Sequence, residues 1–305
     1  MAALLIAVIY LIFVSLGLPD SLLGSGWPVM QRTFDVPSSY AGYVSMTISL
    51  MTVFSALFSP TFIRKFHTKY IVIFSIFLSV VGLMGFSMST EYYMLFIFAV
   101  PYGLGAGAID ASINHYVANN YSGAIMNFLH CFYGLGALLS PNIMAIAIKH
   151  ARWNEGYSRV AIIQICIMAV CIISLPLWKK QEAAKKNEDH ESAGIWEAIR
   201  VPGVLLTLIA FWASCSGEAT TYLWTSSYFS DTKPGIGDET AAACGSLVFL
   251  GLMTARFLSG LVSNKLGDRN LIRIGLGSEA LGILFVLLSG SGYVLAAMGF
   301  VLIGF

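Results

Sequence analysis

Three acidic residues interrupt apolar stretches of this 305-residue chain, and they are its most informative chemical groups. Asp20 lies in "GLPDSLLGSGWP" (17–28) and is the only charged residue between Met1 and Arg32. Asp110 and Glu218 occupy similar surroundings. Desolvation raises the pKa of a carboxyl group, which lets such a group load and release a proton near neutral pH. The alternative is that each acid only caps a helix or pairs within a bundle.

Helical spacing places further polar and aromatic side chains on the same faces as these acids. Asp20, Gly24 and Trp27 follow i, i+4, i+7, and Glu218 lies four residues before Tyr222. Side-chain amides both donate and accept hydrogen bonds, histidine titrates near neutral pH, and aromatic rings can stack on a ligand. The alternatives are amides that join helices, a neutral core histidine and aromatic anchors at the membrane interface.

The composition indicates a protein whose surface faces lipid. Charged residues make up 11% of the chain, hydrophobic residues 57%, and the mean hydropathy is +0.77. A soluble domain carries about 25% charged residues. The net charge of +1 argues against a nucleic-acid partner. The five cysteines show no metal-binding spacing, so we expect buried thiols, no metal and no cofactor.

Ten apolar segments are candidates for spans, which need roughly 20 residues each. All must be helical, because unpaired backbone groups are costly in hydrocarbon. We therefore expect an all-α, polytopic membrane protein, and the tenth segment is cut off at Phe305. The segments are 2–32, 39–62, 70–89, 92–117, 122–148, 159–178, 201–229, 240–263, 270–289 and 292–305. No basic residue precedes the first segment, which favours a membrane helix over a signal peptide.

Basic residues in the connections predict the orientation. With a cytoplasmic N-terminus, the inside loops hold eleven Lys and Arg residues and the outside loops hold five. The longest polar connection, 179–200, is then a cytoplasmic linker or surface helix.

The two parts of the chain resemble each other at an offset near 200 residues. "FVSLGLPDSLL" (13–23) aligns with "FWASCSGEATT" (211–221), which places Asp20 on Glu218. "SPTFIRK" (59–65) aligns with "SGLVSNK" (259–265), which places Lys65 on Lys265. The repeat predicts a six-helix bundle over 1–178 and a partial second bundle over 201–305.

The loop after segment 240–263 carries a family signature. Gly260-Leu-Val-Ser-Asn264-Lys265-Leu-Gly267-Asp268-Arg269 resembles the signature loop of the major facilitator superfamily, with Asn264 in place of the usual acid. The copy "SPTFIRKFHTKY" (59–70) keeps the basic residues but lacks both glycines and the acid. "GLPDSLLGSGWP" together with "LHCFYGLGALLSP" (129–141) is similar to bacterial sugar permeases of the fucose–galactose–glucose:proton symporter type.

This resemblance implies two pseudo-symmetric six-helix bundles that rock about a central site, the second being incomplete in a C-terminally truncated chain. It implies a monomeric secondary active transporter of a small polar solute, such as a sugar, in the inner (plasma) membrane. Coupling to protons is expected, with sodium as an alternative. Arg256 is expected to pair with an acid, Glu279 being one candidate. The expected substrate-binding or proton-coupling residues are Asp20, Trp27, Asp110, Asn114, Asn127, His130, Gln164, Glu218, Tyr222 and Trp224. The expected gating-loop residues are Lys65, Arg256, Asn264, Lys265, Gly267 and Arg269.

Three other functions compete with this expectation. Segment 122–148 departs from the glycine-rich pattern of drug antiporters, which favours symport over drug or metabolite efflux. A non-transporting sensor of the same fold is the second alternative. A membrane enzyme using His130 with Asp110 or Glu218 is the third, but the sequence holds no HExxH or GxSxG motif, so we expect no enzyme.

Overall fold

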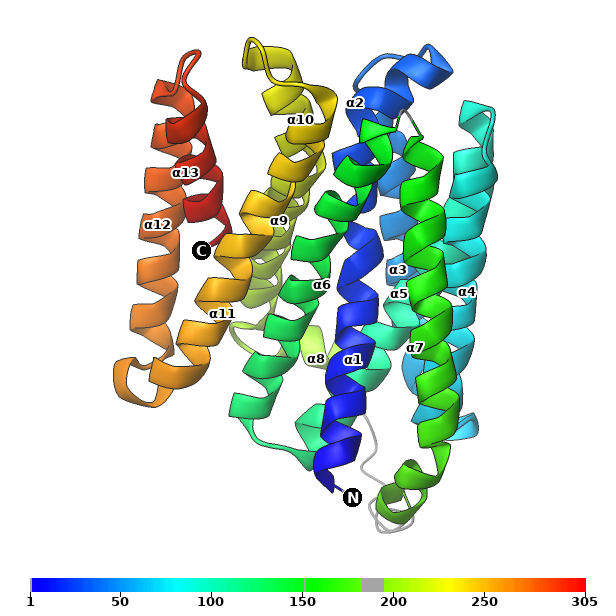
Figure 1. Cartoon of the computed structure of the whole chain (residues 1–305). Coiled ribbons are helices and arrows are strands. Elements are labelled where there is room, and N and C mark those ends of the chain that lie inside the picture. Colours follow the sequence, from blue (N-terminus) through cyan, green and yellow to red (C-terminus); the bar gives the residue numbers. More distant parts are fainter. Residues whose placement is uncertain (1, 151, 183–194) are drawn as a thin grey trace.

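The computed structural model describes residues 2–150, 152–182 and 195–305, and the regular structure within these ranges is entirely helical (Figure 1). The helices are α1 (Ala2–Asp20), α2 (Leu22–Phe34), α3 (Tyr40–Lys65), α4 (Thr68–Met88), α5 (Tyr92–Asn120), α6 (Gly123–Lys149), α7 (Trp153–Glu182), α8 (Ile195–Arg200), α9 (Val204–Thr232), α10 (Asp238–Cys244), α11 (Ser246–Leu266), α12 (Asp268–Leu288) and α13 (Tyr293–Gly304).

Within the described ranges, nine helical segments are long and apolar enough to cross a membrane. They correspond to the first nine predicted segments. The tenth corresponds to α13, which has 12 residues and is shorter than a span. The predicted linker 179–200 is only partly described: α7 extends to Glu182, α8 occupies Ile195–Arg200, and 183–194 lie outside the described residues.

The helix boundaries repeat along the chain. Both ends of α4 and α12 differ by 200 residues, since Thr68 matches Asp268 and Met88 matches Leu288. This is the offset found in the sequence, so α4 and α12 are equivalent helices.

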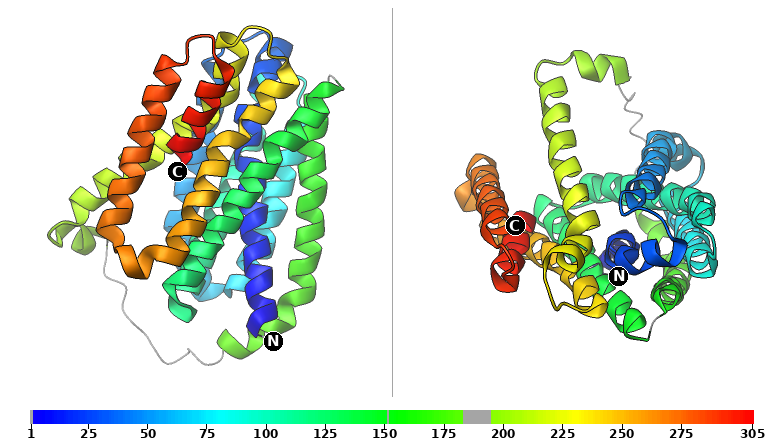
Figure 2. Two further views of the ribbon diagram at one scale, coloured as in Figure 1. Left: turned by 60° about the vertical axis from the view of Figure 1, so that its left-hand side comes forward. Right: turned by 90° about the horizontal axis from the view of Figure 1, so that it is seen from above.

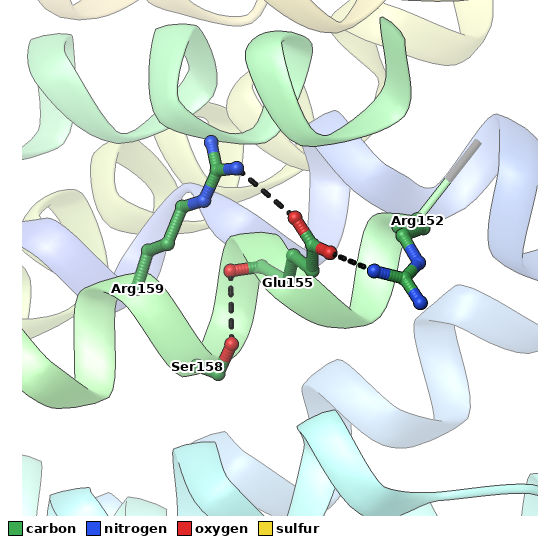
Figure 3. Close-up of polar contacts among 4 residues, drawn as sticks. All are labelled: Arg152, Glu155, Ser158 and Arg159. Carbon is green, nitrogen blue, oxygen red and sulfur yellow. Dashed lines mark hydrogen bonds and ion pairs between the residues drawn. The ribbon is translucent and has the colours of Figure 1, made fainter. Parts of the chain in front are cut away.

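The prediction for α7 was wrong at its start, which lies at Trp153 and not near residue 159. Charged residues near the start of the helix made this part of the sequence look like a loop, but these residues form ion pairs with one another (Figure 3). Glu155 accepts from Arg152 Nη1 at 2.6 Å and from Arg159 Nη2 at 3.0 Å. An acid in the first turn also interacts favourably with the positive end of the helix dipole.

A proline in α1 leaves a backbone carbonyl that a distant helix satisfies. Pro19 has no N–H, so the carbonyl of Ser15 loses its partner within the helix. Gln164 of α7 donates to this carbonyl through Nε2 and accepts from Ser15 Oγ through Oε1 at 2.6 Å. The amide therefore joins α1 to α7.

The same arrangement recurs in α6. Pro141 leaves the carbonyl of Ala137 without its helical donor. Ser21, which lies between α1 and α2, donates to it through Oγ at 2.9 Å. Unpaired backbone groups are costly in a membrane, so these bonds fix how α1, α6 and α7 pack.

The halves meet where α2 and α6 pack against α9, α10 and α11. Glycines permit the close approach: a Cβ on Gly134 would lie 3.2 Å from Met253 Cα, and one on Gly24 would lie 3.0 Å from Leu223 Cα. Arg32 also bridges to Asp238 across this contact, at 2.7 Å. The start of α9 leaves the contact, and it extends with α8 away from the other helices (Figure 2).

Candidate functional site

Asp20 is held by two phenol groups from different helices. It is the last residue of α1, at the break before α2. Tyr133 of α6 donates to Oδ2 at 2.9 Å, and Tyr102 of α5 donates to Oδ1. Tyr102 is buried, and Asp20 is half-buried. Both carboxylate oxygens therefore have partners in an environment poor in water.

A cavity of about 40 Å³ lies beside this carboxylate. Besides Asp20 and Tyr102, its lining includes Tyr157 of α7 and two residues of the second half, Tyr222 and Leu223 of α9. Ligand pockets usually measure about 300–1,000 Å³, whereas a water molecule needs only about 10–15 Å³ of this kind of volume. The space beside Asp20 suits water or a proton and is too small for a sugar.

A larger cavity of about 430 Å³ lies mainly in the second half. Its polar lining includes Glu218 of α9, Arg256 of α11 and Glu279 of α12, together with Asn127 from α6 of the first half. The predicted partners Arg256 and Glu279 thus face the same space. Its volume lies within the usual range for ligand pockets.

The three acids predicted from the sequence are linked electrostatically through Asp20. Asp20 lies within electrostatic range of Asp110 and Glu218. Glu218 in turn lies within range of Arg256. Two of these acids, Asp20 and Asp110, accept hydrogen bonds from side chains, and the third, Glu218, has the Arg256 cation nearby.

Asp110 and Asn114 form a pair one turn apart on α5. Asn114 donates to Asp110 Oδ1 at 2.8 Å, and Asp110 is exposed. Among the described residues, the buried Oδ1 of Asn114 has no hydrogen-bond partner. An unpartnered buried acceptor is costly, so this position favours a donor from elsewhere, such as a solute hydroxyl.

Several predicted binding residues lie in packed surroundings. Trp27 is completely buried and donates through Nε1 to the Ser38 carbonyl at 2.7 Å. Gln164 is 1% exposed and bonded to Ser15 at both ends of its amide. Both side chains are thus buried and hydrogen-bonded within the protein, and their assignment as solute contacts stays a prediction. Their side chains have almost no exposed surface for a ligand.

The other predicted residues of this class are partly buried. His130 packs edge-on against Phe13, with ring centroids 5.5 Å apart. Trp224 packs against the main core. Tyr222 stacks on Phe249 at 5.6 Å while it also lines the small cavity beside Asp20.

The predicted gating-loop residues lie at the turns of equivalent helix pairs, except Arg256, which lies within α11 and lines the larger cavity. Lys65 ends α3, Lys265 lies in the last turn of α11, and Arg269 is exposed in the first turn of α12. Gly267 has φ +71°, a conformation that favours glycine. Asn264 belongs to α11, but its side chain lies outside the described part.

Sequence reasoning missed Tyr102 and Tyr133, the two donors to Asp20. Each lies beside a glycine in an apolar helix, where a tyrosine usually serves as core or as an interface anchor. Only the packing of three helices reveals their common acceptor.

Comparison with known proteins gives the same family throughout. The family model described as "Major Facilitator Superfamily" matches residues 9–305. The glucose/mannose transporter GlcP of Bacillus subtilis is 21% identical over 275 residues, covering 84% of this chain and 65% of that protein. Bypass of stop codon protein 6 of Saccharomyces cerevisiae is 21% identical over 282 residues, covering 84% of this chain and 56% of that protein. The chain thus spans less than two thirds of the length of these relatives.

Solved structures share the fold at low identity. The xylose transporter XylE from E. coli, in a partially occluded inward open conformation, has a TM-score of 0.72 at 11% identity, covering 98% of this chain and 82% of that one. FucP, in an outward conformation, has a TM-score of 0.65 at 16% identity, covering 98% and 81%. With a family model matched over nearly its whole length and a helical fold shared with these transporters, the chain belongs to the major facilitator superfamily.

Proposed function

We propose that the protein is a proton-coupled symporter of a small polar solute, most reasonably a sugar, working by alternating access. The observation that carries the proposal is the Asp20 carboxylate, which is held by Tyr102 and Tyr133 and lies beside a small cavity that Tyr222 of α9 also lines. Because residues of both halves surround this carboxylate, its surroundings change when the two halves move relative to each other. Its protonation can therefore bias which side of the membrane the site faces.

The solute would occupy the larger polar space. Glu218, Arg256 and Asn127 supply acceptors and donors there. A sugar hydroxyl both donates and accepts, which such mixed groups can satisfy. The names of GlcP and XylE support a sugar as the first solute class to test.

The test is uptake of a panel of radiolabelled monosaccharides by proteoliposomes that contain the protein. With an acidic outside and a neutral inside, at least one sugar should accumulate above its equilibrium level, and a protonophore should abolish the accumulation. Extrusion of a preloaded compound under the same gradient would instead indicate a drug or metabolite efflux antiporter. Accumulation that requires a sodium gradient would replace the proton as the coupling ion.

A further inference from the structure

The small cavity beside Asp20 has a second polar wall, which α3 supplies. Ser45 and Ser49 lie one turn apart on this helix, and both line the cavity. Ser45 is half-buried and Ser49 is exposed. The cavity that borders the Asp20 carboxylate therefore extends to a side chain at the surface of the first half.

The hydroxyl groups of these two serines are free to bind water. A hydroxyl in a helix can donate to the carbonyl one turn earlier, as Thr47 does to the Tyr43 carbonyl at 3.0 Å. Among the described residues, neither Ser45 Oγ nor Ser49 Oγ has such a partner. A serine hydroxyl offers one donor and two acceptor positions, so both serines can bind water on two sides.

The two serines lie outside the apolar face of α3. Met46, Leu50 and Val53 follow i, i+4, i+7, and each is more than half exposed. Consecutive residues of a helix are about 100° apart, which places Ser45 and Ser49 to one side of this stripe. The surface at Ser49 is therefore next to the strip of α3 that suits lipid and not within it.

The cavity has both the room and the polar groups that water requires. Its volume of about 40 Å³ exceeds the roughly 10–15 Å³ that one water molecule needs. Asp20, the two serines and Tyr222 supply polar partners for it. A carboxylate has about four acceptor positions, of which Tyr102 and Tyr133 occupy two. Acceptor positions on Asp20 thus remain for water or a proton.

An alternative route to Asp20 would run through the other acids. Asp110 and Glu218 lie within electrostatic range of this carboxylate, but neither of them lines the small cavity. A route through these acids would not depend on α3, which makes the two routes separable by substitution.

We propose that protons reach Asp20 through water bound by Ser45 and Ser49, an inference that rests on the proposed proton coupling. Each hydroxyl donates to one water molecule while it accepts from another, which keeps the chain of hydrogen bonds continuous. The last water molecule transfers a proton to a free position on the carboxylate, which becomes a neutral carboxyl group. The water molecule regains a proton from its neighbour in the chain.

The test follows hydrogen–deuterium exchange of the Asp20 carboxyl group by time-resolved infrared spectroscopy of the whole chain in proteoliposomes at acidic pH. The C=O stretching band of protonated Asp20 is the band that Asp20→Asn removes, and it shifts when heavy water replaces water. Ser49→Val should slow this shift about tenfold or more, because the hydrogen bonds of the hydroxyl are lost. Ser49→Thr adds nearly the same volume but keeps the hydroxyl, so it should exchange at close to the parent rate.

Two more variants complete the test. Ser45→Val should slow the exchange as Ser49→Val does. Thr47→Val is the matched control on the same helix, because Thr47 does not line the cavity and its hydroxyl is bonded to the Tyr43 carbonyl. Exchange at the parent rate in either serine-to-valine variant, or exchange in Ser49→Thr as slow as in Ser49→Val, would overturn the proposal.

The exchange measurement needs neither a solute nor a pH gradient. Fast exchange in the valine variants would therefore reject the route along α3 and leave proton-coupled symport intact. If Asp20→Asn removed no carboxyl band, Asp20 would not bind a proton, and both the route and its part in coupling would be rejected.

Discussion

Asp20 is unusual because its two oxygens are held by residues more than 80 positions away in the chain. Hydrogen bonds to a charged group contribute about 1.5–3 kcal/mol each. Loss of a phenol donor should therefore destabilise the deprotonated carboxylate far more than the protonated carboxyl group. The two tyrosines are positioning residues for the proposed proton site.

We predict that Tyr102→Phe or Tyr133→Phe slows pH-gradient-driven uptake roughly tenfold or more, because each removes one charge-assisted hydrogen bond. Initial uptake rates in proteoliposomes measure this. Tyr157→Phe is the matched control: Tyr157 lines the same cavity, but its hydroxyl faces Met30 Sδ at 3.6 Å. A control as slow as the other two variants would show that the cavity shape matters and the bonds do not.

For single residues, the sequence predicted which acids matter but not which side chains donate hydrogen bonds to them. Asp20 and Glu218 stood out because charge is scarce in their segments, and they do lie within electrostatic range of each other. Gln164 and Trp27 looked equally suited to bind a solute. Whether an amide or an indole faces a cavity or another helix depends on packing across the chain, which spacing within one helix does not reveal.

The elements are predictable where hydrophobicity alone decides. Ten spans were predicted, and nine helices in the described ranges are long and apolar enough to cross a membrane, while the tenth segment corresponds to the 12-residue α13. The break between α1 and α2 was not predicted, because composition is apolar on both sides of Ser21. The break has a local and a tertiary cause. Pro19 removes a backbone hydrogen bond within α1, and residues near the break form hydrogen bonds with other helices instead.

The amide bridge between α1 and α7 gives a stability prediction. Gln164→Leu keeps most of the side-chain volume but leaves the Ser15 carbonyl buried without its donor, which should destabilise the protein by about 1–3 kcal/mol. The thermal midpoint in detergent should fall. Asn142→Leu is the matched control, since Asn142 is exposed and bonds only within its own helix, to Leu138.

An unchanged midpoint for Gln164→Leu would mean that another donor, such as water, satisfies the Ser15 carbonyl. Gln164 would then not be needed to compensate for the missing N–H of Pro19 in α1.

At the level of the whole molecule, the halves touch along α2, α6, α9, α10 and α11. Among the described residues, one ion pair, from Arg32 to Asp238, joins their exposed ends. Exposed ion pairs are worth only about 0–1 kcal/mol. That is small, yet it suffices to shift an equilibrium between two conformations several-fold when they have similar free energies.

We predict that Arg32→Ala increases the population with separated ends of α2 and α10, by up to about fivefold. Electron paramagnetic resonance distances between labels at positions 35 and 239 measure this, in a background without the native cysteines. Arg152→Ala, which removes an exposed arginine paired within the same half, is the control. Identical distance distributions for Arg32→Ala and the parent protein would exclude the bridge as a conformational determinant.

The most direct test of the account separates coupling from movement of the solute. Asp20→Asn retains an oxygen that can accept from a tyrosine but cannot take up a proton. It should abolish accumulation driven by a pH gradient while sugar exchange across equal concentrations continues. Glu155→Gln, which neutralises a half-buried acid held by two arginines, should retain both activities. Accumulation by Asp20→Asn at the parent level would contradict the account, because a proton would then be coupled elsewhere.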